Sequence, residues 1–171
     1  VLYGIHFAKN DIRKQEECLM VEGYTDVISL TQEGIENVVS SSGTSLTAGQ
    51  VKLIKRYTNN ITLIYDGDAA GIKAAIRGVD IILETGLNVK VCLLPEDQDP
   101  DSFIKENGGE YFKKYLTENK IDFILFKTHQ LSESAKNDPV KKAENVLDIV
   151  GSIAKIPDAI KRSIYVKECA R

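Results

Sequence analysis

Six carboxylates in this 171-residue chain have the types and the spacing of a divalent-metal site. They form three pairs, and each pair follows a short apolar run: Glu22 and Asp26, Asp66 and Asp68, and Asp99 and Asp101. Oxygen ligands of this kind suit Mg²⁺ or Mn²⁺. Two such ions can stabilise the attacking and the leaving oxygen in phosphoryl transfer. The residue types therefore point to metal-dependent chemistry on a phosphate.

The central pair lies in the segment Asp66-Gly67-Asp68, directly after residues 61–65. A run rich in Ile, Thr and Tyr predicts a buried strand, and Gly67 permits a tight exit from it. Two negative charges a few ångströms apart repel each other, and a cation between them relieves the repulsion. The pair is therefore interpreted first as a metal site.

Most of these acids also have a simpler interpretation as helix caps. Asp26, Asp68, Asp99 and Asp101 all stand where N-caps or first-turn acids belong. Glu22 and Asp66 end apolar strands, where no cap is required. Because all three pairs are expected at one edge of one sheet, the metal interpretation is favoured over a set of unrelated caps.

The predicted elements would bring the three pairs together. Apolar runs at residues 18–21, 37–40, 61–65 and 89–94 read as strands, and the stretches at about 24–33, 47–57 and 69–85 read as helices. This alternation predicts a parallel sheet with helices on both faces. In such a sheet the loops after the strands open at one edge, where ligands bind. Thr47 is expected as a helix N-cap, and Gly34 and Gly86 are expected just after helix C-termini.

The rest of the chain is expected to frame this α/β unit. Residues 1–17 are polar and read as a solvated entry loop. After Pro100 the strand signals stop, and helices are expected at about 101–107, 110–118 and 122–131, after Asp138, and from about Pro157. The predicted division is a catalytic metal-binding domain at residues 1–117, including the entry segment, and a helical segment at residues 118–171.

Composition narrows the class of protein. A net charge of −3 argues against a broad basic surface for nucleic acid on this part of the chain. The three cysteines are far apart and have neither the spacing of a zinc site nor that of a disulfide framework. We therefore expect no zinc site, and we expect the protein to reside in a reducing cytosol. No apolar run is long enough for a membrane span. The polar loop at residues 40–45 is interpreted either as a phosphate-binding loop at the same sheet edge or as a simple turn.

Three segments resemble the Toprim domain of bacterial DnaG-type DNA primases. They are Val21-Glu22-Gly23-Tyr24-Thr25-Asp26-Val27, Asp66-Gly67-Asp68-Ala69-Ala70-Gly71, and Asp99-Pro100-Asp101-Ser102. The resemblance extends over essentially the whole chain. It implies a Toprim-like parallel sheet followed by helices of the primase polymerase domain.

The resemblance also implies an activity and a set of roles. It implies a DNA-directed RNA polymerase that joins ribonucleoside triphosphates into short primers on a single-stranded DNA template, in the bacterial cytoplasm. Carried over by position, the metal ligands are Glu22, Asp66, Asp68, Asp99 and Asp101, and the catalytic residues are Glu22, Asp26, Asp66 and Asp68. Glu22 is expected either to bind metal or to help move a proton. Two or more Mg²⁺ or Mn²⁺ ions are expected.

Related activities remain as alternatives to primer synthesis. They are a Toprim nuclease, a topoisomerase cleavage domain and a non-catalytic nucleic-acid-binding module. Family primases also carry a zinc-binding domain, a basic DNA-tracking subdomain and a helicase-interacting domain, which this sequence does not contain. We therefore expect contact with the replicative helicase through a domain outside this sequence, and little or no priming by these residues alone.

Overall fold

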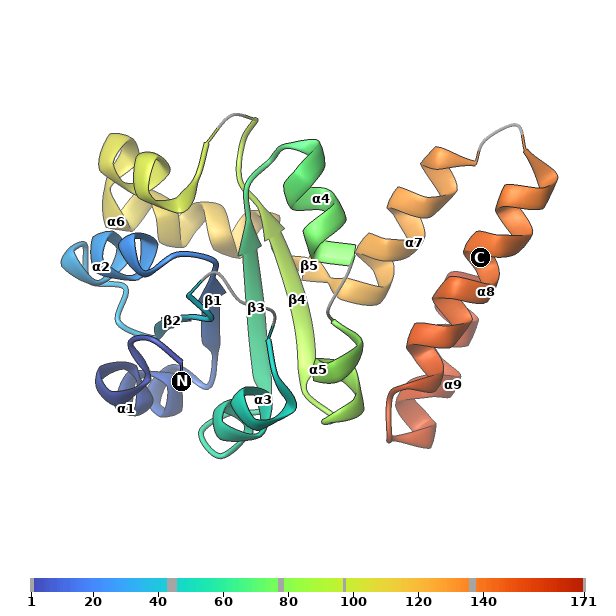
Figure 1. Ribbon diagram of the computed structural model, residues 1–171, viewed down its shortest axis with the longest axis horizontal. Helices are drawn as coiled ribbons and strands as arrows, with labels where there is room; N and C mark the ends of the chain where they lie inside the picture. Colours follow the sequence, from blue (N-terminus) through green and yellow to red (C-terminus); the bar gives the residue numbers. More distant parts are fainter. Residues whose placement is uncertain (1, 43–45, 77–78, 97, 136–137, 171) are drawn as a thin grey trace.

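The computed structural model describes residues 2–42, 46–76, 79–96, 98–135 and 138–170. Its centre is a five-stranded sheet in the order β2-β1-β3-β4-β5 (Figure 1). The strands are β1 (Cys18–Val21), β2 (Val38–Ser40), β3 (Asn60–Tyr65), β4 (Asn88–Leu93) and β5 (Ile121–Asp122). The first four pair in parallel, as the alternating apolar runs predict. The predicted α/β architecture is confirmed.

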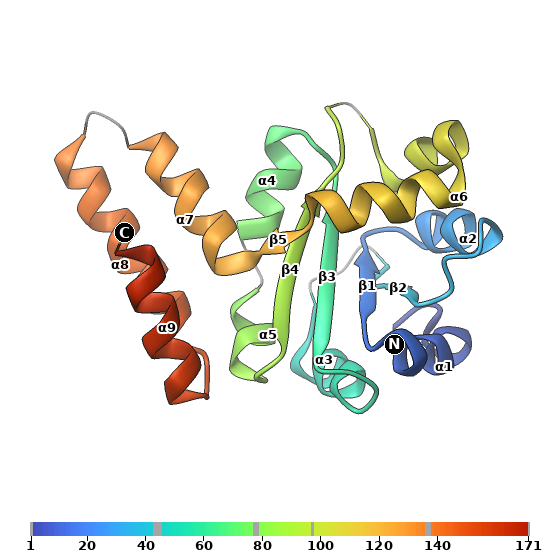
Figure 2. The same ribbon diagram turned by 180° about the vertical axis from the view of Figure 1, so that it is seen from behind.

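Helices cover both faces of this sheet. In chain order they are α1 (Ile5–Gln15), α2 (Tyr24–Gln32), α3 (Ala48–Lys55), α4 (Ala69–Ile76), α5 (Asp80–Glu84), α6 (Pro100–Asn119), α7 (Phe123–Ser134), α8 (Pro139–Ala154) and α9 (Ala159–Cys169). Helices α2 and α6 pack on one face, where α6 crosses the strands in Figure 2. Helices α1, α3, α4 and α5 pack on the other face.

Strand β1 shows why both faces need cover. Its residues are all buried and alternate between two cores. Cys18 and Met20 pack with α1 and α3, whereas Leu19 and Val21 pack with α2 and α6. Because successive side chains of a strand point to opposite faces, an uninterrupted apolar strand is stable only between two layers of helices.

The predicted helix ends are confirmed at three places. The Oγ1 of Thr47 accepts a hydrogen bond from the backbone N–H of Gln50 and so caps α3. Gly34 and Gly86 follow α2 and α5 with φ of 78° and 81°. At this conformation glycine avoids the steric cost that a side chain would add.

Three expectations about the elements need correction, and a fourth is confirmed. Residues 1–17 are not an irregular entry loop, because Ala8 and Ile12, four positions apart, are buried on one face of α1. Residues 69–85 form two helices, α4 and α5, rather than one. The break expected between the helices at 101–107 and 110–118 is confirmed, because α6 consists of two helical stretches that meet at Gly108, where a φ of 78° is not helical. The sheet is not wholly parallel, since β5 pairs antiparallel with β4.

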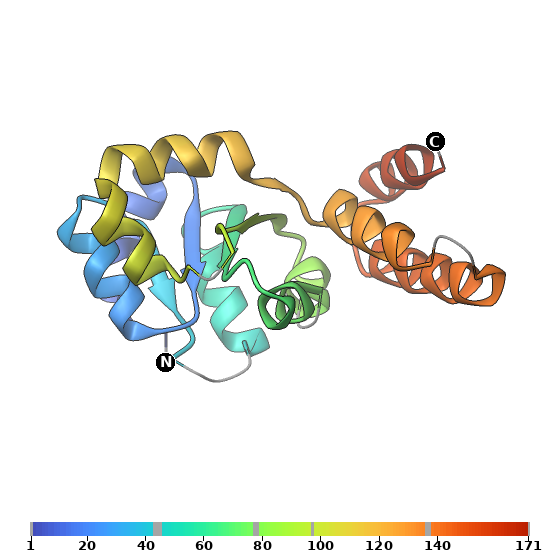
Figure 3. The same ribbon diagram turned by 90° about the horizontal axis from the view of Figure 1, so that it is seen from above.

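Helices α7, α8 and α9 extend to one side of the sheet beyond β5 (Figure 3). A buried lysine joins the first two of them. The Nζ of Lys127 on α7 donates to Asp148 Oδ1 at 2.9 Å and to Ser152 Oγ at 2.8 Å on α8. No helix among the described residues is both long and apolar enough to cross a membrane.

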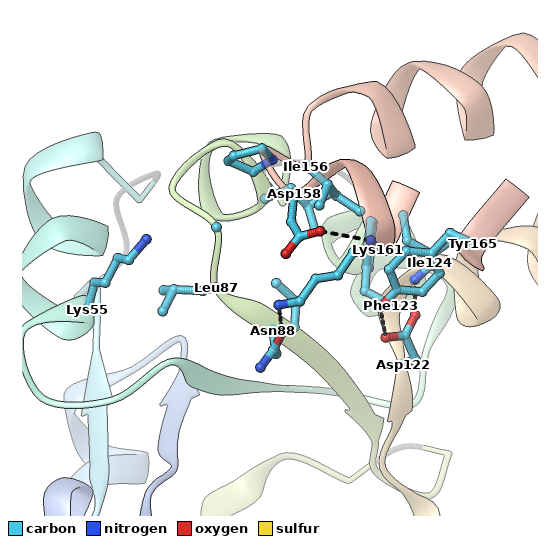
Figure 4. Close-up of a pocket in the computed structure, with 14 residues that line it drawn as sticks. Lys55, Leu87, Asn88, Asp122, Phe123, Ile124, Ile156, Asp158, Lys161 and Tyr165 are labelled. Atoms are coloured by element: carbon cyan, nitrogen blue, oxygen red, sulfur yellow. Dashed lines mark hydrogen bonds between the residues drawn. The ribbon is translucent and has the colours of Figure 1, made fainter. Parts of the chain in front are cut away.

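The last helix also contacts the sheet, at the amino end of β4. There it borders a cavity of about 210 Å³ that α9 shares with β4, β5 and α7 (Figure 4). Lys161 donates to Asn88 Oδ1 at 2.7 Å, and the Tyr165 hydroxyl donates to Asp122 Oδ2 at 2.5 Å. Because β5 belongs to the sheet, the helical segment is tied to the α/β unit by strand pairing as well as by these contacts. The division at residues 117 and 118 stays a prediction.

Candidate metal centre

The three acidic pairs lie at the carboxyl edge of the sheet. Glu22 follows β1 and is exposed, and Asp26 is 8% exposed in the first turn of α2. Asp66 and Asp68 connect β3 to α4, and the last pair, Asp99 and Asp101, begins α6. These loops rise at the same end of the strands, at the top of Figure 1.

Two of the three loops touch each other through Gly67. A Cβ placed at Gly67 would overlap the backbone carbonyl oxygens of Leu94 and Pro95, in the loop that follows β4. Only glycine permits this approach of one backbone to another. The loop that carries Asp66 and Asp68 is therefore held against the loop that leads to Asp99.

Asp68 and Asp99 orient their carboxylates by capping helices. Asp68 Oδ1 accepts a hydrogen bond from the N–H of Gly71 at 2.6 Å at the start of α4. At the start of α6, Asp99 Oδ1 accepts a hydrogen bond of 2.7 Å from the backbone N–H of Ser102. From the described residues, the Oδ2 atoms of these two acids accept no hydrogen bond. The capping role and a ligand role are therefore compatible for the same side chain.

Asp26 and Asp101 join the start of α2 to the start of α6. Asp26 Oδ2 accepts a hydrogen bond of 3.0 Å from the backbone N–H of Gly23. Burial raises the pKa of Asp26, as do the charges of Asp99 and Asp101, while the backbone amides of Gly23 and Asp101 lower it. Asp101 accepts hydrogen bonds from Lys105 and from the Ser29 hydroxyl, which hold its pKa below the ordinary value.

The charges converge on Asp66. Its pKa is raised from 3.8 to about 6, first by burial and then by repulsion from other carboxylates. The repelling groups, in falling order, are Glu22, Asp99, Asp26 and Asp68. Burial, with a smaller effect of Glu22, also raises the pKa of the neighbouring Tyr65 to about 12. Four of the other five sequence-predicted acids therefore act on Asp66, and the fifth, Asp101, acts on Asp26.

The donor set fits a hard divalent cation. Every candidate ligand is a carboxylate, and such oxygens are the ligands of Mg²⁺ and Mn²⁺. The mutual repulsion at Asp66 is the conflict that a cation relieves. As the side chains stand, no three or more His, Cys, Asp or Glu residues in the described part of the chain already form a group that could hold an ion. Ligation would therefore require rotation of some carboxylates, and the ligand assignment stays a prediction.

Two residues of this region were not found from the sequence. Both contact Asp101: a serine within an apolar helix such as Ser29 carries no distinguishing signal, whereas Lys105 stands four residues after Asp101, the i,i+4 spacing of a helical ion pair. The alternatives for the loop at residues 40–45 cannot be compared, because residues 43–45 lie outside the described residues. Asp97 lies outside them as well.

Comparisons with known proteins agree with this geometry. A family model described as Toprim-like matches residues 19–104. The DNA primase of Clostridium acetobutylicum is 40% identical over 171 residues, and that of Listeria monocytogenes is 39% identical over 172 residues. These alignments include 98% and 99% of this chain but 28% of each relative. The chain thus spans little more than a quarter of the length of these relatives.

Solved structures match over the whole chain. A DNA primase domain from Pseudomonas aeruginosa superposes with a TM-score of 0.88 at 31% identity, covering 99% of this chain and 54% of that one. A DnaG primase catalytic domain bound to single-stranded DNA superposes with a TM-score of 0.86 at 31% identity, covering 99% and 56%. The matched regions include the sheet, the acidic edge and the C-terminal helices. The chain therefore belongs to the Toprim-like family and corresponds to the Toprim-containing part of the DnaG-type primase catalytic core.

Proposed function

We propose that this chain supplies the metal-binding acids of a DNA primase, an RNA polymerase that makes short primers on single-stranded DNA. The observation that carries the proposal is the acidic edge, where burial and then the carboxylates of three loops raise the pKa of Asp66 to about 6. The similarity to DnaG catalytic cores over the whole chain favours primer synthesis among the activities of Toprim-like proteins.

The residues that would hold two or more Mg²⁺ or Mn²⁺ ions are Glu22, Asp66, Asp68, Asp99 and Asp101. When bound, the ions would supply positive charge for the triphosphate and for the oxygens between which the phosphoryl group moves. Asp68 and Asp99 are oriented for this role by their helix caps. Asp26, buried and bonded to the backbone, would fix the loop that carries Glu22.

The substrates and partners follow from the same proposal. They are a single-stranded DNA template, ribonucleoside triphosphates and the replicative helicase, the last through sequence outside this chain. The proposed place of action is the bacterial cytoplasm. With its net charge of −3, this part of the protein offers little attraction for DNA on its own. We therefore expect weak or no priming by these 171 residues alone.

A priming assay of the longer polypeptide that contains this chain tests the proposal. With single-stranded template, ribonucleotides and Mn²⁺, Asp66→Asn is expected to reduce primer synthesis by more than about 100-fold, the order of loss when transition-state charge is left unstabilised. Glu110→Gln removes an exposed acid paired with Lys113 on α6 and serves as the matched control, with synthesis unchanged.

The outcomes separate the alternatives. Metal-dependent cleavage of DNA without primer synthesis would favour a nuclease. Mn²⁺ binding without either reaction would favour a non-catalytic module. Priming by Asp66→Asn at the normal rate would remove Asp66 from the metal site.

A further inference from the structure

Both carboxylate oxygens of Asp101 already have hydrogen-bond donors, and the two donors differ in kind. The Ser29 hydroxyl of α2 donates to Oδ1. The Lys105 ammonium, one turn further along α6, lies 2.7 Å from Oδ2. Ser29 is only 7% exposed, whereas the Lys105 side chain is 65% exposed. One donor is therefore fixed in packed structure, and the other can leave for solvent.

The hydrogen bond from Ser29 is not the one that its own helix would provide. Hydroxyls inside helices commonly donate to the carbonyl one turn back. Thr31, two residues later in α2, does this by donating to the Val27 carbonyl at 2.7 Å. Ser29 instead crosses from α2 to α6. This crossing fixes Asp101, whose loop follows β4, relative to the helix that follows Glu22 and β1.

We propose that Ser29 is a positioning residue that holds Asp101 in place for metal, and that Lys105 is a replaceable counter-ion which the metal displaces from Asp101. The inference rests on the proposed function, in which Asp101 is a metal ligand. A second hydrogen bond to a ligating carboxylate fixes its orientation, and loss of such a partner commonly weakens metal binding by about 10–100-fold. An ammonium on the same carboxylate competes with the incoming cation.

The two neighbours of Asp101 should therefore have opposite effects on metal affinity. Ser29→Ala is expected to weaken Mn²⁺ binding by about 10-fold or more, and Ser29→Thr, which keeps the hydroxyl, should restore most of it. Lys105→Met should strengthen Mn²⁺ binding by about 2–5-fold, the range expected for loss of an exposed ion pair. Lys113→Met is the matched control, because Lys113 lies on the same helix but pairs with Glu110.

The measurement is a titration with Mn²⁺ alone, in which the electron paramagnetic resonance of free Mn²⁺ gives the affinity. Thermal melting in EDTA identifies any variant that does not fold. In an Asp101→Asn background, Ser29→Ala should cause no further loss, since its effect passes through the Asp101 carboxylate. A full additional loss in that background, or equal effects of Lys105→Met and Lys113→Met, would overturn the proposal.

The design separates this inference from the proposed function. If wild type binds Mn²⁺ and Asp66→Asn does not, the metal site stands whatever Ser29 does. Unchanged affinity in Ser29→Ala would then reject the positioning role alone. If wild type and Asp66→Asn both fail to bind Mn²⁺, the proposed metal site itself is wrong.

Discussion

Asp66 shows how one residue can be costly in the free protein and useful in a complex. Burial and, to a smaller extent, four other carboxylates raise its pKa to about 6. A structure that only had to be stable would not place an acid there, because ionisation at neutral pH is disfavoured by burial and by like charge. Active sites commonly keep such groups at some expense to stability.

This conflict predicts a pH-dependent gain of stability in Asp66→Asn. The pKa of Asp66 in the folded state, about 6, exceeds its ordinary value of 3.8, so the folded protein binds more protons between these values. Ionisation of Asp66 therefore lowers stability as the pH rises from about 4 to about 6. Asparagine carries no such charge. Asp66→Asn should melt about 1–3 °C above wild type at pH 7.5, allowing for solvent screening.

Calorimetry in EDTA at pH 4 and pH 7.5 checks this expectation. The difference in melting temperature should nearly disappear at pH 4. Asp11→Asn on α1, away from the acidic edge, should show no such pH-dependent gain. A gain of equal size at both pH values would mean that the Asp66 charge is not its source.

At the scale of elements, the site depends on the contact between two loops. Gly67 lets the loop after β3 lie against Leu94 and Pro95 of the loop after β4. Gly67→Ala should push these loops apart and destabilise the fold by about 1–3 kcal/mol, the usual cost of overpacking. Mn²⁺ affinity should fall as well, because Asp66 and Asp68 flank the substituted position.

Urea unfolding and Mn²⁺ titration of Gly67→Ala test this contact. Gly151 is the matched control, since it lies in α8 and a Cβ there meets no atom within 4 Å. Gly151→Ala should stabilise the protein by about 0.5–1 kcal/mol through helix propensity. A Gly67→Ala protein as stable as wild type would contradict the close approach of the two loops.

The elements that are best predicted from the sequence are those whose apolar composition shows that they are buried. Strands β1 to β4 are short apolar runs, and their order in an α/β alternation places the acids at one edge. Helix α1 was missed because only Ala8 and Ile12 of its eleven residues are buried. Strand β5 was missed because it has two residues, Ile121 and Asp122, and only its pairing with β4 defines it.

The sequence predicted which acids belong to the candidate site, but it did not predict all of the contacts that hold these acids in place. The capping roles of Asp68 and Asp99 were among the expected alternatives and are confirmed. The contact of Asp101 with Ser29 depends on how α2 packs against α6, and it joins residues that are 72 positions apart, which no local pattern predicts. The contact of Asp101 with Lys105 lies within α6 and has the local i,i+4 spacing of a helical ion pair.

At the scale of the whole molecule, Lys127 connects the C-terminal helices. Its side chain is 4% exposed and bonds to Asp148 and Ser152. Asp148→Ala should destabilise the protein by about 1–3 kcal/mol, since it removes the charged partner of a buried ammonium. Lys127→Met should cost less, because an apolar side chain of similar length leaves no buried charge unpaired.

Urea unfolding of both variants measures this difference. Glu84→Ala breaks the more exposed ion pair with Lys155 and should change stability by less than about 1 kcal/mol. Lys127→Met could instead prove more destabilising than Asp148→Ala. That result would mean that the polar contact itself stabilises the packing of α7 on α8, rather than the avoidance of an unpaired buried charge.

The chain as a whole combines a sheet that gathers acids at one edge with helices that extend away from the sheet. Its alignments with the DNA primases of Clostridium acetobutylicum and Listeria monocytogenes cover 28% of each relative. We propose that acids from three separate loops of this chain bind divalent metal at one place.

The most direct test is anomalous diffraction from crystals soaked in Mn²⁺. We expect Mn²⁺ at the carboxyl edge of the sheet, within about 2.5 Å of carboxylate oxygens from at least two of the three acidic pairs. The peak should be absent from crystals of Asp66→Asn. No Mn²⁺ at this edge under saturating soaks, or Mn²⁺ bound only elsewhere on the chain, would contradict the account.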